Sequence, residues 1–236
     1  MKKINVLILG LLVGAGVYSQ PVNDPNIEVR EVKGFSAIRV SGAFDVYLTQ
    51  GDEEKVAVSA SDKKFLENIK TEVKDGVLQI GWEHGKKWNI GNKKLRAYIS
   101  FKEIKKLSAD GASDIKIIGA LKAGDLEINL SGASDLLDGR LEAKNLSFAI
   151  SGASDVKISG SAEKLDIDAS GASSFKGFNF SADYCNAKAS GASDISITVN
   201  KELSANATGA SDIGYKGSAI VNVVKTTGAS SISHKS

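Results

Sequence analysis

The chain has 236 residues, of which 30 are basic, 28 acidic, two histidine and one cysteine. A charge balance this close to neutral gives no electrostatic attraction to nucleic acid or to anionic lipid. So few histidines and cysteines exclude a zinc centre, a haem site or an intramolecular disulfide framework, and we expect no cofactor and no metal site.

The N-terminus has the pattern of an export signal. Lys2 and Lys3 precede a mostly apolar run over residues 4–17, which is too short to span a bilayer and is followed by small residues. This pattern predicts a signal peptide over residues 1–19 and an extracytoplasmic protein, located in the periplasm, on the cell surface or outside the cell. No cysteine comes directly after the apolar run, so we expect no lipoprotein anchor. No second apolar stretch of membrane length exists, so we expect no integral membrane segment after signal removal.

Residues 20–34 are expected to form an N-terminal extension, and residues 35–106 an irregular β section that shields one end of the fold. Within this section, Ser61 or Asp62 is placed to cap a short helix carrying Phe65, Leu66 and Ile69.

Strands are predicted in the same section from alternating apolar and polar residues. They cover residues 56–58, 71–73, 77–80 and 95–101. Lys-Asp-Gly at residues 74–76 joins two of them, which indicates either a hairpin or a tight corner.

Residues 82–94 are polar and contain glycine, and we expect a loop there. Both tryptophans of the chain, Trp82 and Trp88, lie in this stretch, together with His84. The two indole rings have two interpretations: they stack on a sugar or anchor a partner surface, or they seal an end of the fold. On the first interpretation, Trp82, His84 and Trp88 are the candidate ligand or partner contacts.

From residue 107 to residue 236 the sequence repeats Gly-Ala-Ser seven times, at intervals of 18 to 21 residues. A period near 20 predicts a solenoid, in which each unit buries its apolar face against its neighbours. An earlier copy, Ser-Gly-Ala-Phe-Asp, lies at residues 41–45. The seven repeated glycines, called here the corner glycines, are Gly111, Gly132, Gly152, Gly171, Gly191, Gly209 and Gly228.

Each copy is flanked by strand patterns. Positions two, four and six before the corner glycine are mostly apolar and the positions between are mostly polar, and a second apolar column follows the motif. Asp138 and Gly177 interrupt that second column. Cys185 falls in a column of leucines, which predicts a buried and inert thiol.

These patterns predict an all-β fold, a single-stranded right-handed parallel β-helix with about 20 residues per rung and an irregular N-terminal capping section. The motif is then the corner of each rung. Glycine supplies a positive φ or allows close approach, alanine keeps the bend thin, and serine and aspartate hydrogen-bond to nearby backbone.

Two other interpretations of the motif are weaker. A calcium ladder has repeats of nine residues, and Ser174 and Ser231 replace the aspartate in two copies. An ice-binding array of the motif serines would favour threonine, which is scarce here. We therefore interpret the motif as architecture.

The segments at residues 35–51, 75–80 and 107–114, together with the later Ser-Gly-Ala-Ser-Asp copies, resemble the family named "putative auto-transporter adhesin, head GIN domain". The resemblance covers nearly all of the chain after residue 35. It implies an exported, β-helical bacterial protein, and it brings no catalytic residues with it.

Three functions are compatible with this sequence. The first is a non-catalytic, adhesin-like module of the cell envelope or surface that binds a glycan or a surface protein. The second is a carbohydrate-active β-helix enzyme acting on polysaccharide through the loop at residues 82–94, and the third is a purely structural envelope protein. Little sequence follows the last repeat, so we expect self-association through the C-terminal rung.

Overall fold

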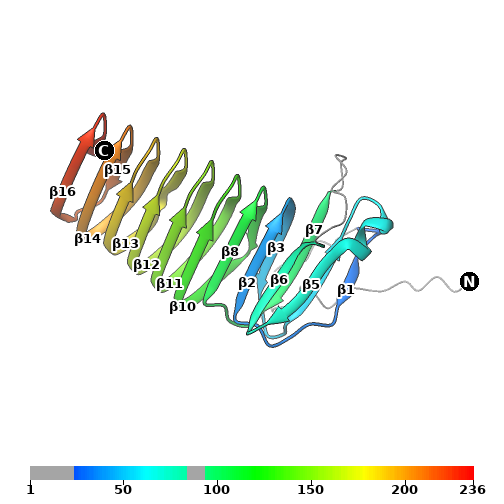
Figure 1. Cartoon of the computed structure of the whole chain (residues 1–236). Coiled ribbons are helices and arrows are strands. Elements are labelled where there is room, and N and C mark those ends of the chain that lie inside the picture. Colours follow the sequence, from blue (N-terminus) through cyan, green and yellow to red (C-terminus); the bar gives the residue numbers. More distant parts are fainter. Residues whose placement is uncertain (1–23, 84–93) are drawn as a thin grey trace, which may run out of the picture.

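The computed structural model describes residues 24–83 and 94–236, and 70% of the chain is strand and 3% helix (Figure 1). The strands stack in parallel, about 20 residues apart, into a β-solenoid of about six turns, which confirms the predicted β-helix; its right-handed sense stays a prediction. The elements are β1 (Glu28–Arg30), β2 (Ala37–Gly42), β3 (Phe44–Gln50), β4 (Lys55–Ser59), η1 (Lys63–Asn68), β5 (Ile69–Lys74), β6 (Val77–Trp82), β7 (Leu95–Phe101), β8 (Lys106–Gly111), β9 (Asp114–Ile118), β10 (Ala120–Leu130), β11 (Asp135–Ile150), β12 (Asp155–Ala169), β13 (Ser174–Ala189), β14 (Asp194–Gly209), β15 (Asp212–Lys216), β16 (Ile220–Gly228) and β17 (Ser231–His234).

The first rungs do not stack in chain order. β2 and β3 form one rung, which pairs with β6 and β7 on one side and with β8 and β9 on the other. The chain therefore leaves this rung, builds the capped end, returns through β6 and β7, and then passes over β2 and β3 to continue the rod. In Figure 1 the blue strands β2 and β3 accordingly lie between cyan and green neighbours.

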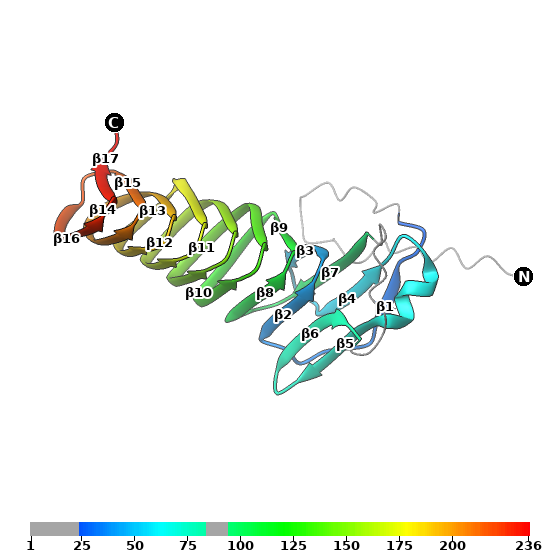
Figure 2. The ribbon, with the colours of Figure 1, turned by 45° about the horizontal axis from the view of Figure 1, so that its top comes forward.

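The capped end is made of antiparallel pairs that cover the open edges of the β6–β7 rung. β5 forms a hairpin with β6, and β4 lies antiparallel between β7 and β1 (Figure 2). Asp75 and Gly76 both have positive φ (52° and 74°) at the hairpin turn, as a two-residue turn of this kind requires, so the hairpin interpretation is confirmed. The short predicted helix is the 3-10 helix η1, which carries Phe65 and Leu66, whereas Ile69 already begins β5. The Asp62 side chain accepts a hydrogen bond from the Lys64 N–H, as expected of a capping residue.

In the regular array, equivalent residues of successive rungs lie in register and form continuous columns. Leu126, Leu146, Leu165, Cys185 and Leu203 form one such column, and all five are buried. The predicted burial of Cys185 is therefore confirmed, and burial raises the pKa of its thiol to about 12.

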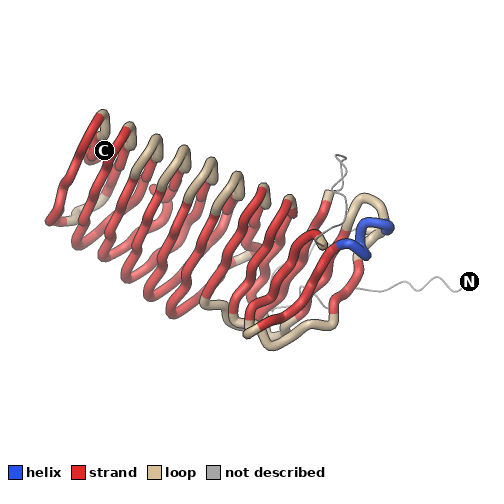
Figure 3. The backbone as a smooth tube through the Cα atoms, viewed as in Figure 1, coloured by secondary structure: helices blue, strands red, loops and turns tan. Residues whose placement is uncertain are grey.

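The corner glycines satisfy both requirements that the sequence suggested. All seven have φ between 77° and 99°. A Cβ on Gly152 would lie 2.3 Å from the Gly132 carbonyl oxygen, so the rungs pack too closely at the corner for any side chain. Figure 3 shows most of these corners as tan segments in a row along one edge of the rod.

The alanine of the corner differs from the expectation. It is exposed in each central copy, for example Ala133 and Ala153, so the bend leaves room for a larger side chain at this position. The serine that follows points inward instead, and Ser134 and Ser154 have no exposed surface. Position within the rung explains this outcome: the serine lies two residues before the first buried residue of the second strand, as Ser134 does before Leu136, so it is in phase with that buried column.

Candidate functional site

The buried corner serines form a hydrogen-bonded ladder inside the rod. The Ser154 Oγ accepts a hydrogen bond from the Ser134 N–H at 3.2 Å, and the Ser211 Oγ donates to the Thr208 carbonyl at 2.9 Å. A buried hydroxyl needs such partners, and here the ladder supplies them within and between rungs. Because these hydroxyls are inside, they form no ice-binding surface.

The aspartates after the corner form a column on the outside of the rod. Asp45, Asp114, Asp135 and Asp155 lie in register on four successive rungs. Burial, together with the like charges of Asp135 and Asp45, raises the pKa of Asp114. Asp155 forms an ion pair with Lys176 at 2.8 Å.

This column does not assemble a metal site. Across residues 24–83 and 94–236, no group of three or more histidine, cysteine, aspartate or glutamate side chains is arranged to hold an ion. The Asp135 carboxylate instead accepts a hydrogen bond from the Asp155 N–H at 2.7 Å, so it joins neighbouring rungs. The column therefore serves the stacking of the rungs.

Trp82 ends β6 and faces the capped end of the rod. Its ring centroid lies 6.2 Å from that of Phe65 in η1, and Trp82 packs partly buried against the core. This position fits the interpretation that Trp82 seals an end of the fold. His84 and Trp88 lie outside the described residues.

The connection from β6 to β7 replaces a Gly-Ala-Ser corner. β6 pairs with β2 and β7 with β3, and β2 and β3 are themselves joined through the corner at Gly42. Residues 83–94 therefore occupy the position in the sequence that corresponds to the short turn of the neighbouring rung.

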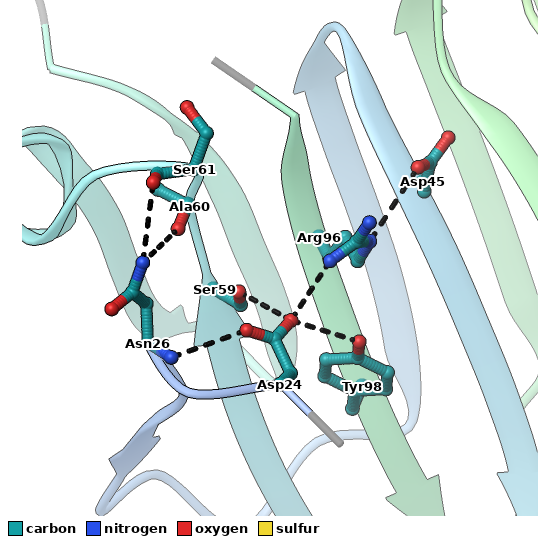
Figure 4. A network of polar contacts seen from close by, with 8 residues as sticks. All are labelled: Asp24, Asn26, Asp45, Ser59, Ala60, Ser61, Arg96 and Tyr98. Carbon is teal, nitrogen blue, oxygen red and sulfur yellow. Dashed lines mark hydrogen bonds and ion pairs between the residues drawn. The ribbon is translucent and has the colours of Figure 1, made fainter. Parts of the chain in front are cut away.

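A buried polar network fixes the N-terminal segment to the capped end (Figure 4). The Asp24 side chain is 5% exposed and accepts hydrogen bonds from Ser59 Oγ at 2.5 Å, Arg96 Nη1 at 3.0 Å and Tyr98 OH at 3.2 Å. Burial opposes ionisation of this carboxyl, but the hydrogen bonds from Ser59, the Asn26 backbone and Arg96 outweigh it and lower the pKa of Asp24. The donors come from β4 and β7, so the network joins the start of the described chain to both strands.

A hollow of about 740 Å³ lies on the flank of the rod, where the second strand of each rung bends into the third segment. We call it the flank groove. It crosses five successive rungs, and among the residues that line it are Gly119, Gly139, Arg140, Lys157, Lys176 and Phe178.

The flank groove arises where the repeat is irregular. The strand register shifts between Leu136 and Gly139, between Lys157 and Gly160, and between Gly177 and Ser181. Such bulges bend a strand away from its neighbour. Gly119 and Gly139 contribute no side chain to the lining, and a Cβ on Gly119 would meet nothing within 4 Å, so the bend leaves a hollow.

Charged side chains line the wall of the flank groove. Lys157 forms an ion pair with Asp138 at 2.9 Å, and Arg140 forms one with Glu142 at 3.0 Å. A hydrogen bond from Lys157 and its positive charge lower the pKa of Asp138. The sequence pattern did show the interruptions at Asp138 and Gly177, which mark this place, but not that they open a groove.

The comparisons with known proteins agree with this architecture. A family model described as "Putative auto-transporter adhesin, head GIN domain" matches residues 34–219. No curated protein matches the chain.

Several solved structures share the fold. A putative adhesin from Bacteroides fragilis superposes with a TM-score of 0.79 at 22% identity, covering 89% of this chain and 96% of that one. A putative adhesin from Parabacteroides distasonis has a TM-score of 0.70 at 20% identity, covering 89% and 96%. A structure titled putative lipid binding protein, from the same organism, has a TM-score of 0.68 at 23% identity, covering 91% and 98%.

Proposed function

The chain belongs to the "putative auto-transporter adhesin, head GIN domain" family, and from this membership we propose that it is a non-catalytic, adhesin-like binding module of the bacterial envelope or surface. Its partner is a glycan or a surface protein. The predicted signal peptide at residues 1–19 lies outside the described residues and is part of this proposal. No helix in the described part of the chain is long and apolar enough to cross a membrane.

The observation that carries the proposal is the flank groove. It lies on the outside of a rigid rod, and its walls offer charged groups and the ring of Phe178, which is 39% exposed. A surface with hydrogen-bond donors, acceptors and a partly exposed ring suits recognition of a polar polymer or of a protein surface.

The same groove favours binding over catalysis. Glycoside hydrolysis uses two carboxyl groups across the scissile bond, one of them with a raised pKa. Asp138 is the one carboxylate among the described residues that line the flank groove, and its pKa is lowered. This arrangement supports a non-catalytic module rather than a carbohydrate-active enzyme.

Two further contacts belong to the proposal. Trp82, His84 and Trp88 remain candidate ligand or partner contacts in this proposal. At the other end, Ile220 is 69% and Val224 56% exposed on β16, and we propose that copies of the chain associate through this rung.

The direct test is a binding screen with the purified protein that lacks the predicted signal peptide, residues 1–19. The immobilised protein is probed with a glycan array and with detergent-solubilised surface proteins from bacterial and epithelial cells. The proposal expects saturable binding to at least one glycan or surface protein and no turnover of bound glycan. Absence of saturable binding in both screens would contradict it and would favour a purely structural role.

A further inference from the structure

We propose that the flank groove binds an acidic polysaccharide, with the polymer lying along the rod and its carboxylate or sulfate groups facing a row of basic side chains. This inference rests on the proposed binding function and names its ligand class and site.

The first argument is the charge of the groove. Three basic residues, Arg140, Lys157 and Lys176, and one acidic residue, Asp138, line it. Glu142 and Asp155 pair with two of these cations from outside the lining, and Lys216 adds a fourth cation, 5.2 Å from the centroid of the Phe178 ring. Among these side chains the basic groups outnumber the carboxylates by one, and a row of cations on a concave surface attracts a ligand of the opposite charge.

The second argument is that the basic groups keep donors for a ligand. Lys157 and Lys176 each direct their ammonium group to one carboxylate, that of Asp138 and that of Asp155. An ammonium has three N–H donors and a guanidinium has five. Arg140 uses one N–H of Nε and one of Nη2 on a single oxygen of Glu142, which leaves three N–H groups, two on Nη1 and one on Nη2. The ion pairs therefore hold the cations in place without exhausting them.

The third argument is the length of the groove. Its lining runs from Ile117 to Ser196 and crosses five rungs. Four intervals at about 4.8 Å give about 19 Å, which accommodates several sugar units in a row and not one alone. Lys157 and Lys176 are in register on adjacent rungs, so the charges repeat along the direction of the polymer.

The fourth argument concerns the surface between the charges. The hydroxyl and amide groups of Ser159, Asn179 and Ser196 lie along the groove. The partly exposed Phe178 ring lies at one side of it, with the Lys216 ammonium over the ring. Polar groups beside an aromatic face suit a sugar, which has hydroxyls at its rim and C–H groups on its face. An acyl chain would need an enclosed apolar cavity, so these observations favour a polysaccharide over a lipid.

The test compares two triple variants by titration calorimetry against polygalacturonate and alginate, with dextran as the neutral polymer and phosphatidylglycerol vesicles as the lipid probe. The groove variant is R140Q/K157Q/K176Q. The control variant is K144Q/K164Q/K188Q, which removes the same charge from exposed lysines on another face of the rod. F178A serves as a second groove variant that leaves the charge unchanged. Thermal unfolding verifies that all three variants fold.

We expect at least tenfold weaker binding of the acidic polymers by the groove variant, and a shallower dependence of affinity on salt because three ionic contacts are lost. F178A should bind severalfold more weakly at every salt concentration, and the control variant should match the wild type.

Four results would overturn the inference. Equal losses in both triple variants would mean general attraction to polyanions. Binding only to phosphatidylglycerol vesicles would assign the groove to lipid. Saturable binding to a neutral glycan or a surface protein, with none to acidic polymers, would overturn this inference and leave the proposed function standing, whereas no binding in any screen would overturn both.

Discussion

Gly42 and Gly111 are 69 residues apart in the chain and in direct contact in the rod. A Cβ on Gly111 would lie 2.4 Å from the Gly42 carbonyl oxygen, and the Ala112 N–H donates a hydrogen bond to that oxygen at 2.7 Å. The earliest copy of the motif is therefore the next corner of the array, although the capped end is inserted between the two copies in the chain. One corner geometry thus continues from β2 and β3 to the last rung.

This close packing predicts that a corner glycine tolerates no side chain. Gly152 and Gly34 have the same φ of 79°, but a Cβ on Gly152 would lie 2.3 Å from a backbone oxygen, whereas a Cβ on Gly34 meets nothing within 4 Å. We expect Gly34→Ala to cost about 1 kcal/mol from backbone strain alone. Gly152→Ala should cost on the order of 3 kcal/mol or more, because the rungs must also separate.

Urea unfolding of the two variants measures this difference. Equal losses of stability in both would show that backbone conformation, and not contact between rungs, explains the repeated glycine.

The Asp24 network predicts acid sensitivity of the capped end. The folded protein holds the pKa of Asp24 below its ordinary 3.8, so the ionised carboxylate stabilises the fold above that value. This stability is lost as the pH falls from about 3.9 through the lowered pKa, and it is fully present at pH 7. We expect Asp24→Asn to cost about 1 to 3 kcal/mol at pH 7 and progressively less below pH 4.

Asp45→Asn is the matched control, since Asp45 approaches the same Arg96 at 3.8 Å from a side chain that is 47% exposed. It should lose much less stability at pH 7. A loss of stability in Asp24→Asn that does not change with pH would mean that packing, rather than the carboxylate charge, holds the N-terminal segment on the capped end.

The aspartate column predicts a stabilising substitution. Burial and two like-charged neighbours raise the pKa of Asp114, so its ionised form is unfavourable in the folded chain. Ser174 and Ser231 occupy equivalent positions in other rungs. We therefore expect Asp114→Ser to raise the free energy of unfolding at pH 7 by about 0.5 kcal/mol, and the gain to vanish at low pH where the carboxyl is protonated.

Asp194→Ser provides the comparison, because Asp194 is exposed and has an aspartate on only one neighbouring rung, with Ser174 on the other. The free energy of unfolding should rise less in Asp194→Ser than in Asp114→Ser. Thermal melts across pH 3 to 8 distinguish the two, and a loss of stability in Asp114→Ser would contradict the repulsion.

The regular part of the fold could be predicted because each rung repeats the same local requirements. Alternation identified the buried columns, including Cys185, and the repeated glycine identified the corner. Whether the alanine or the serine faces inward could not be read from the motif, because the answer depends on where the turn begins relative to the buried column.

The parts that were missed depend on long-range contacts. Asp24 meets Arg96 across 72 residues, and the order of the first rungs depends on pairings between segments far apart in the chain. The flank groove depends on register shifts between rungs. The interruptions at Asp138 and Gly177 indicated where these shifts occur but not that they open a groove. A sequence pattern records the repeat well and its irregularities poorly, and here the candidate site lies in an irregularity.

The proposed adhesin-like role requires that this rod is displayed on the cell surface, and labelling of intact cells tests that requirement most directly. The natural Cys185 is 6% exposed with a pKa of about 12, so the wild type should not react with a membrane-impermeant maleimide and provides the background. Ala153→Cys places a thiol on an exposed corner. We predict that Ala153→Cys is labelled on intact cells. Labelling only after the outer envelope is permeabilised would contradict the adhesin-like role.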